Sequence, residues 1–192
     1  MKNSIALVAV AGIAAAATAQ TATVTVNPSA TMIDTTATDA ASRTVSVTVT
    51  ITGDNGLTTF DAVMDAVEGS GLFTTANPML VNPLLFTAVA GVSEARVEGP
   101  IGVRAFGSGP LLSGTDISGQ QFTFDLIANA GAVGTVDLTV VGSGFSDIAT
   151  MGLFATAYDN VVVNNATITL VPAPASLALL GLGGLAATRR RR

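Results

Sequence analysis

The most regular pattern in the chain is an alternation of apolar and hydroxyl side chains over residues 44–52, where valine or isoleucine occupies every second position and threonine or serine the others. An alternation with period two is typical of a β-strand that buries one face. Further segments alternate less regularly and are also predicted to be strands, namely residues 21–26, 60–67, 96–106, 121–127, 135–141 and 161–170. Residues 149–158 fit either a strand or a short helix.

Residues that favour turns separate these segments. Glycine, asparagine, aspartate and proline gather at residues 53–56, 108–110, 129–131 and 142–144, and they tolerate or impose the backbone angles that turns need. Short strands punctuated in this way predict an all-β domain, a β-sandwich. The pairs Asn77-Pro78 and Asn82-Pro83 bracket an apolar segment, which we expect to form a loop over one sheet edge because proline cannot donate to a β-ladder.

The N-terminal segment has the order of a secretory signal. Lys2 precedes an apolar run over residues 5–16, and Ala17 and Ala19 are small residues directly before Gln20. This order predicts a signal helix over residues 1–19 that is removed after Ala19. The run is shorter than the roughly 20 residues that a permanent membrane-spanning helix needs. A buried N-terminal helix is the alternative.

The C-terminal segment also has three parts. A proline-containing motif comes first, an apolar run over residues 176–187 follows, and a cluster of arginines comes last; the motif and the cluster are Val171, Pro172, Ala173 and Pro174, and Arg189, Arg190, Arg191 and Arg192. The prolines end the preceding strand. The apolar run is expected to enter the inner membrane as a hydrophobic helix, and the arginines to stop there because they resist translocation.

This segment resembles a PEP-CTERM sorting signal, with Ala173 in place of the glutamate that names the motif. The resemblance implies that an exosortase is a partner, that it cuts near residues 172–174, and that the protein finishes at the bacterial cell surface or in an extracellular matrix. A plain short membrane anchor is the alternative. The expected organisation is therefore a signal peptide (1–19), a mature β-sandwich (20–170) and a sorting tail (171–192). Residues 45–60 are similar to the opening of cohesin-like sandwiches; a jelly-roll-like sandwich is the related possibility.

Charge and composition exclude several functions. Between the two terminal segments, three arginines face all thirteen acidic residues, which leaves a net charge of −10. Such a surface repels phosphate backbones, so we expect no nucleic-acid binding. Cysteine and histidine are both absent, which removes thiolate nucleophiles, imidazole bases and the commonest zinc ligands. We therefore expect a protein that is not an enzyme and has no cofactor.

The acidic residues offer little chemistry of their own. Asp61 and Asp65 share one strand face but lie about 13 Å apart at the usual rise per residue, farther than the roughly 5 to 9.5 Å of glycosidase carboxylate pairs. Asp54, Asp116 and Asp147 fit calcium ligation or, more simply, turns that bond to their own backbone, and we expect no metal site. The sequence predicts a structural or interaction role, with exopolysaccharide as a further candidate partner of the threonine-rich strand faces. A calcium- or carbohydrate-binding module is the alternative.

Overall fold

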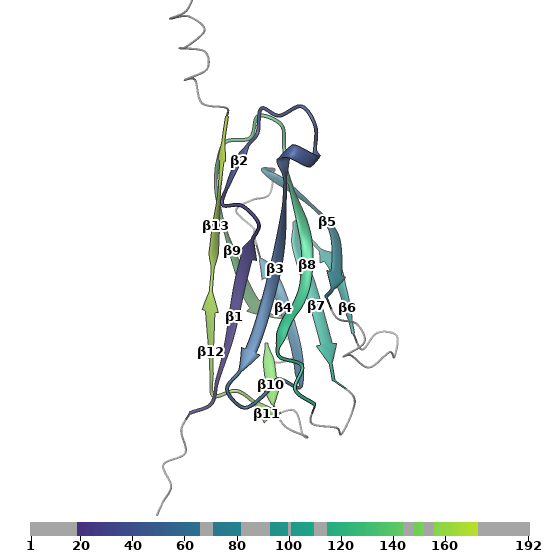
Figure 1. Ribbon diagram of the computed structural model, residues 1–192, viewed down its shortest axis with the longest axis vertical. Helices are drawn as coiled ribbons and strands as arrows, with labels where there is room; N and C mark the ends of the chain where they lie inside the picture. Colours follow the sequence, from purple (N-terminus) through teal and green to yellow (C-terminus); the bar gives the residue numbers. More distant parts are fainter. Residues whose placement is uncertain are drawn as a thin grey trace, which may run out of the picture.

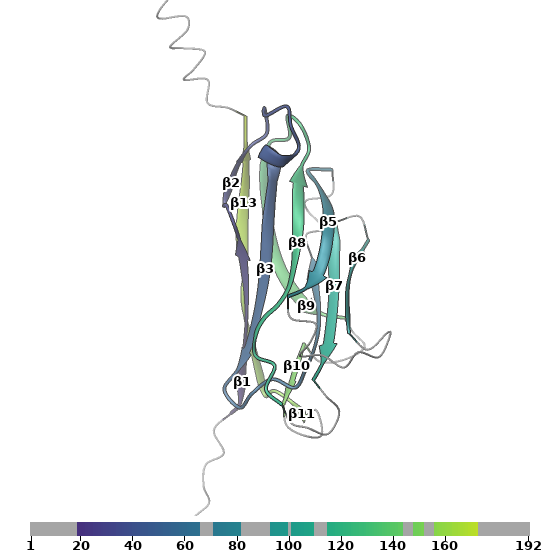
Figure 2. The same ribbon diagram turned by 45° about the vertical axis from the view of Figure 1, so that its right-hand side comes forward.

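The protein is a β-sandwich in which two sheets enclose one apolar core. The computed structural model describes residues 19–65, 71–81, 93–99, 101–109, 115–143, 148–151 and 156–172. Figures 1 and 2 show the two sheets packed face to face. The first sheet has five strands in the order β12-β1-β3-β8-β5. Their bounds are β12 Asn160–Asn164, β1 Thr21–Pro28, β3 Thr44–Gly53, β8 Gly119–Ala128 and β5 Phe73–Leu80.

The second sheet has eight strands, and its two branches meet at β4. Its main path runs β11-β10-β4-β9-β13-β2, and the hairpin of β6 and β7 joins β4 through β7. The bounds are β11 Thr156–Ala157, β10 Ala149–Met151, β4 Thr59–Asp65, β9 Gly134–Gly142, β13 Ala166–Val171, β2 Met32–Asp34, β6 Glu94–Glu98 and β7 Gly102–Ser108. A short 3-10 helix, η1 (Ala41–Arg43), precedes β3.

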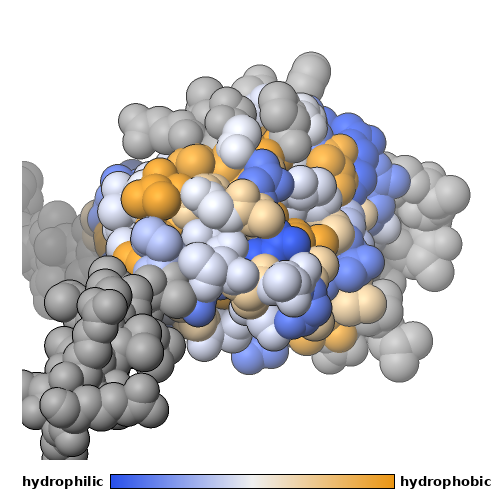
Figure 3. Space-filling view, turned by 90° about the horizontal axis from the view of Figure 1, so that it is seen from above, coloured by the Kyte–Doolittle hydropathy of each residue, from blue (hydrophilic) through white to orange (hydrophobic). Residues whose placement is uncertain are grey.

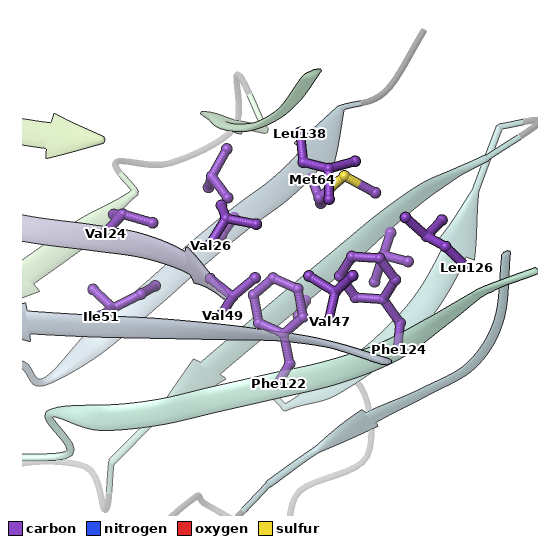
Figure 4. Packing of buried hydrophobic residues seen from close by; sticks show 14 of the residues in the cluster. Val24, Val26, Val47, Val49, Ile51, Met64, Phe122, Phe124, Leu126 and Leu138 are labelled. Atoms are coloured by element: carbon purple, nitrogen blue, oxygen red, sulfur yellow. The ribbon is translucent and has the colours of Figure 1, made fainter. Parts of the chain in front are cut away.

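The alternation in the sequence builds the core directly. Inward-facing valines of β1 and β3 meet phenylalanines of β8 from the same sheet and, across the sandwich, Met64 of β4 and Leu138 of β9 (Figure 4). Phe122 stacks at 6.4 Å from Phe60 and at 6.2 Å from Phe124, measured between ring centroids. Burying this apolar area is the main source of stability for a domain with no disulfide.

Near each end of the described chain, the backbone passes from one sheet to the other along one side of the sandwich. β1 lies in the five-stranded sheet, whereas β2 belongs to the other, and β12 and β13 divide in the same way. The two chain segments run parallel, because β1 pairs with β12 and β2 pairs with β13 in parallel register. As a result β1 starts at one end of the sandwich and β13 finishes at the opposite end (Figure 1).

Most predicted strands are confirmed where the structure describes them, the one over residues 60–67 as far as Asp65. Two predicted strands are each divided in two. Residues 96–106 form the β6–β7 hairpin, which turns at Gly99 with a φ of 70°. Residues 161–170 are divided at Asn165 into β12 and β13, because the chain leaves one sheet for the other there. The helix considered for residues 149–158 is also wrong where the structure describes them, since β10 and β11 lie there.

The loop predicted between Asn77-Pro78 and Asn82-Pro83 is wrong where the structure describes it. Asn77 and Pro78 lie inside β5, an edge strand, and the register of β5 against β8 shifts between Ala76 and Met79. Asn77 has a φ of 51°, so the irregularity interrupts the edge ladder, as proline requires. Asn82 and Pro83 lie outside the described residues. Within the described residues, no helix is both long and apolar enough to cross a membrane.

Candidate functional site

The predicted processing residues lie at the two ends of the sandwich. Ala19 and Gln20 come directly before β1, while Val171 ends β13 and exposed Pro172 follows it. The other members of both motifs lie outside the described residues, namely Ala17, Ala173, Pro174, Arg189, Arg190, Arg191 and Arg192.

Both ends are fastened to the fold by specific hydrogen bonds. The backbone N–H of Gln20 donates to Oδ2 of Asp159 at 2.9 Å. At the other end, the carbonyl of Val171 accepts a bond of 3.0 Å from the N–H of buried Thr35, and the hydroxyl of Thr35 donates to the carbonyl of Ala132 at 2.8 Å. The pairing of the last strand therefore includes Val171, the first residue of the predicted sorting motif.

The calcium candidates bind the protein's own backbone. Oδ2 of Asp54 accepts the N–H of Thr21 at 2.9 Å, and Oδ1 of Asp116 accepts the N–H groups of Leu57 at 2.8 Å and Ser118 at 2.9 Å. No cluster of three metal-ligating side chains occurs among the residues that the structure describes. For Asp116, the bond from Ser118 supports the simpler interpretation of a turn that bonds to its own backbone. Asp54 bonds to β1 instead, and Asp147 lies outside the described residues.

The stability of the fold is expected to depend on whether the carboxyl of Asp116 is ionised. Burial opposes its ionisation, but hydrogen bonds from Ser118 and Leu57 outweigh this and lower the pKa of the carboxyl. A lowered pKa in the folded state stabilises the fold above the unfolded pKa of about 3.9, and the contribution is lost as the pH falls below it. We expect Asp116→Asn to cost about 1 kcal/mol near neutral pH, because Asp116 is exposed to solvent, and nearly nothing near pH 2. Urea unfolding at both pH values measures this, and an equal cost at both would contradict it.

The single tyrosine closes the same end of the sandwich. Tyr158 is buried, and its hydroxyl donates to the carbonyl of Gly56 at 2.5 Å. A Cβ atom on Gly53 would come within 1.8 Å of the Tyr158 hydroxyl oxygen, so only glycine fits beneath the ring. Burial raises the pKa of Tyr158. This arrangement is structural and offers no reactive group.

The outer surface of the eight-stranded sheet carries a second group of side chains, which we call the charged face. It spans β6, β7, β4 and β9 and consists of Glu94, Arg96, Arg104, Phe106, Asp61, Val63 and Val141. The strand registers place four of them in one row across four strands, in the order Arg96, Arg104, Val63 and Val141. Apolar side chains therefore lie beside charges of both signs.

An ion pair fixes the centre of this face. The guanidinium of Arg104 donates to both carboxylate oxygens of Asp61, at 3.1 and 2.9 Å, and Ser143 donates to Oδ2 at 2.6 Å. Arg104 also lies 5.4 Å from the ring centroid of Phe106, and Arg96 lies 5.9 Å from it. Both carboxylate oxygens of Asp61 are thus bound by neighbouring side chains of the charged face.

The outer surface of the five-stranded sheet is different. Its outward positions carry mainly threonine with some asparagine, and adjacent strands place threonines in register, as for Thr25 with Thr50 and Thr23 with Thr52. Asp125 accepts hydrogen bonds from the Ser46 hydroxyl and the Asn77 amide. We call this surface the threonine face. The two faces of the sandwich therefore offer clearly different chemistry.

Comparisons with known proteins identify the fold. No protein-family model and no curated protein sequence matches the chain. Solved structures with similar folds include CaCohA2 of Clostridium acetobutylicum, with a TM-score of 0.54 at 19% identity over 78% of this chain and 91% of that one. The sixth cohesin of scaffoldin B from Acetivibrio cellulolyticus, solved in complex with a dockerin, gives a TM-score of 0.55 at 13% identity over 80% and 100%.

An archaeal domain shows the same similarity. The non-cellulosomal cohesin of Archaeoglobus fulgidus gives a TM-score of 0.52 at 12% identity, covering 82% of this chain and 96% of that chain. At these identities the likeness concerns the fold alone. The chain therefore has a cohesin-like β-sandwich fold, in agreement with the fold expected from residues 45–60.

Proposed function

We propose that this domain is a non-catalytic module that binds a protein partner through the charged face. The observation that carries the proposal is the row of Arg96, Arg104, Val63 and Val141 across four adjacent strands. Protein-binding surfaces combine apolar and aromatic side chains with polar and charged ones, and arginine is enriched there. The similar cohesin of Acetivibrio cellulolyticus, which was solved bound to a dockerin, supports a protein as the partner class.

A matched pair of substitutions tests this proposal. Val141 on the charged face and Val162 on the outer side of β12 are both 41% exposed. With the full chain as bait in extracts of the native host's envelope and medium, Val141→Glu is expected to reduce recovery of the partner at least about tenfold, equivalent to 1.4 kcal/mol. Val162→Glu should leave recovery unchanged. Equal recovery with both variants would rule out the charged face.

We further propose that the chain is exported, held in the inner membrane by its tail, and processed by an exosortase to reach the cell surface or extracellular matrix. The order of proline motif, apolar run and arginine cluster supports this, as does the position of Pro172, which is exposed directly after β13. Pro172 itself lies outside the strands, so a protease acting at this residue need not open a β-ladder there. Exopolysaccharide is a candidate partner for the threonine face in the same matrix.

Intact mass spectrometry of the protein from its native host tests the processing. We expect a chain that begins at Gln20 and ends between residues 171 and 174. A mass that retains Arg189 to Arg192 in every fraction would show a plain membrane anchor and exclude exosortase cleavage.

Removal of the signal after Ala19 has a consequence at Asp159. The new amino group of Gln20 would lie where the backbone N–H now donates to Asp159 at 2.9 Å, so cleavage would turn a neutral donor into a cation. We expect Asp159→Asn to destabilise the chain that starts at Gln20 by about 0.5 kcal/mol at low salt, as for an exposed ion pair. Thermal unfolding measures this, with the uncleaved chain as control. The same loss in both chains would contradict it.

A further inference from the structure

The end of the sandwich from which the tail leaves carries exposed apolar side chains. Met32 is 64% exposed and Val133 is 61% exposed. Thr169 of β13 is the register partner both of Met32 in β2 and of Thr135 in β9, so Met32 and Thr135 lie on one outer surface with a single strand between them. Val133 is two residues from Thr135, towards the end of the sandwich. We call Met32, Val133 and half-buried Val171 the end patch.

The chain restricts how far this patch lies from the tail's apolar run. Only four residues, 172–175, separate Val171 from the start of that run at Ser176, and fully extended they span about 14 Å. The opposite end is much farther away, because the twelve residues from Asn160 to Val171 run the length of the sandwich, which is about 40 Å. Figure 3 looks onto the tail end, where apolar surface lies among polar residues.

We propose that the end patch rests on the lipid surface while the tail holds the protein in the membrane. This inference depends on the proposed membrane insertion of the tail. Met32 and Val133 would then enter the boundary between headgroups and acyl chains, where apolar side chains of peripheral segments are buried.

The contact needs the tail because the patch is small and carries no cation of its own. Asp34 and Asp39 are exposed near it and repel anionic lipids, with Arg43 as the neighbouring cation. An attached membrane segment raises the local concentration of lipid enough for a weak contact to persist. The contact orients the sandwich, with Gln20 pointing away from the membrane and the charged face along the side of the domain, free to bind a partner.

The absence of tryptophan from the chain makes a direct test practical. Met32→Trp and, as matched control, Val162→Trp on β12 near the other end are prepared in the full chain and inserted into vesicles of phosphatidylethanolamine and phosphatidylglycerol containing brominated phosphatidylcholine. Flotation with the vesicles reports tail insertion. We expect both variants to float, and only Met32→Trp to shift its emission to the blue and lose intensity to the bromine quencher.

Each other outcome overturns the inference in a recognisable way. If both variants float and neither is quenched, the tail is inserted and the patch does not touch lipid. A blue shift without lipid that grows with protein concentration would show that a second copy covers the patch. A shift seen only in native membranes would assign the patch to a membrane protein. Failure to float would remove the membrane role of the tail itself.

Discussion

Replacing Phe122 with alanine is expected to lower the free energy of unfolding by about 4 kcal/mol, the typical loss for a fully buried phenylalanine. The ring is completely buried between the sheets and stacks against Phe60 and Phe124. Its removal leaves a cavity that β-strands held by ladders on both sides cannot collapse to fill. Because domains of this size are stabilised by roughly 5 to 15 kcal/mol, a large part of the total is at stake.

Urea unfolding followed by circular dichroism measures this loss. Val162→Ala is the control, since a surface substitution on an edge strand should change stability by less than about 0.5 kcal/mol. Losses of similar size at Phe122 and Val162 would mean that the two sheets do not enclose a common core around Phe122.

Arg104→Met is expected to cost about 3 kcal/mol, because it leaves the carboxylate of Asp61 without its main partner in a largely buried position. The exposed fractions of the two side chains are only 13% and 10%, so water compensates little. Asp61→Asn together with Arg104→Met removes both charges and should recover a substantial part of the loss. A double-mutant cycle by urea unfolding gives the coupling.

The neighbouring pair of Arg96 and Glu94 is the natural control for this cycle. Its side chains are well exposed, so Arg96→Ala should cost at most about 0.5 kcal/mol. If Arg104→Met were equally mild, the ion pair with Asp61 would not organise the charged face.

Strands with one buried face could be predicted from the sequence, because burial of one face makes apolar and polar residues alternate along the strand. Residues 44–52 became β3 for this reason. The prediction was wrong where the tertiary structure decides. The strand expected over residues 96–106 is divided by a turn, and this turn needs glycine at position 102 because a Cβ there would lie 2.5 Å from the carbonyl oxygen of Glu98. Likewise, no local pattern marks Asn165 as the point where the chain changes sheets.

The charged face could not be predicted because its members are distant in sequence. The sequence places Asp61 beside Asp65 of the same strand, whereas its partner Arg104 lies 43 residues later and faces it through the pairing of β4 with β7. The one available signal was that two of the three arginines of the mature region fall in residues 96–106 in alternation with apolar side chains. The charged face forms only when the strand register brings these residues beside Asp61 and Val141, and one sequence does not specify that register.

The most direct test of the proposed binding role is site-specific photo-crosslinking in the native host. A photoreactive amino acid is placed at Val141 on the charged face or at Val162 on the opposite sheet, and the adducts are separated by mass and sequenced. We expect one protein to be crosslinked reproducibly from Val141, to be absent from Val162, and to be lost when Arg96→Glu is added. Equal crosslinking from both positions, or adducts only from Val162, would contradict the assignment of the charged face as the binding surface.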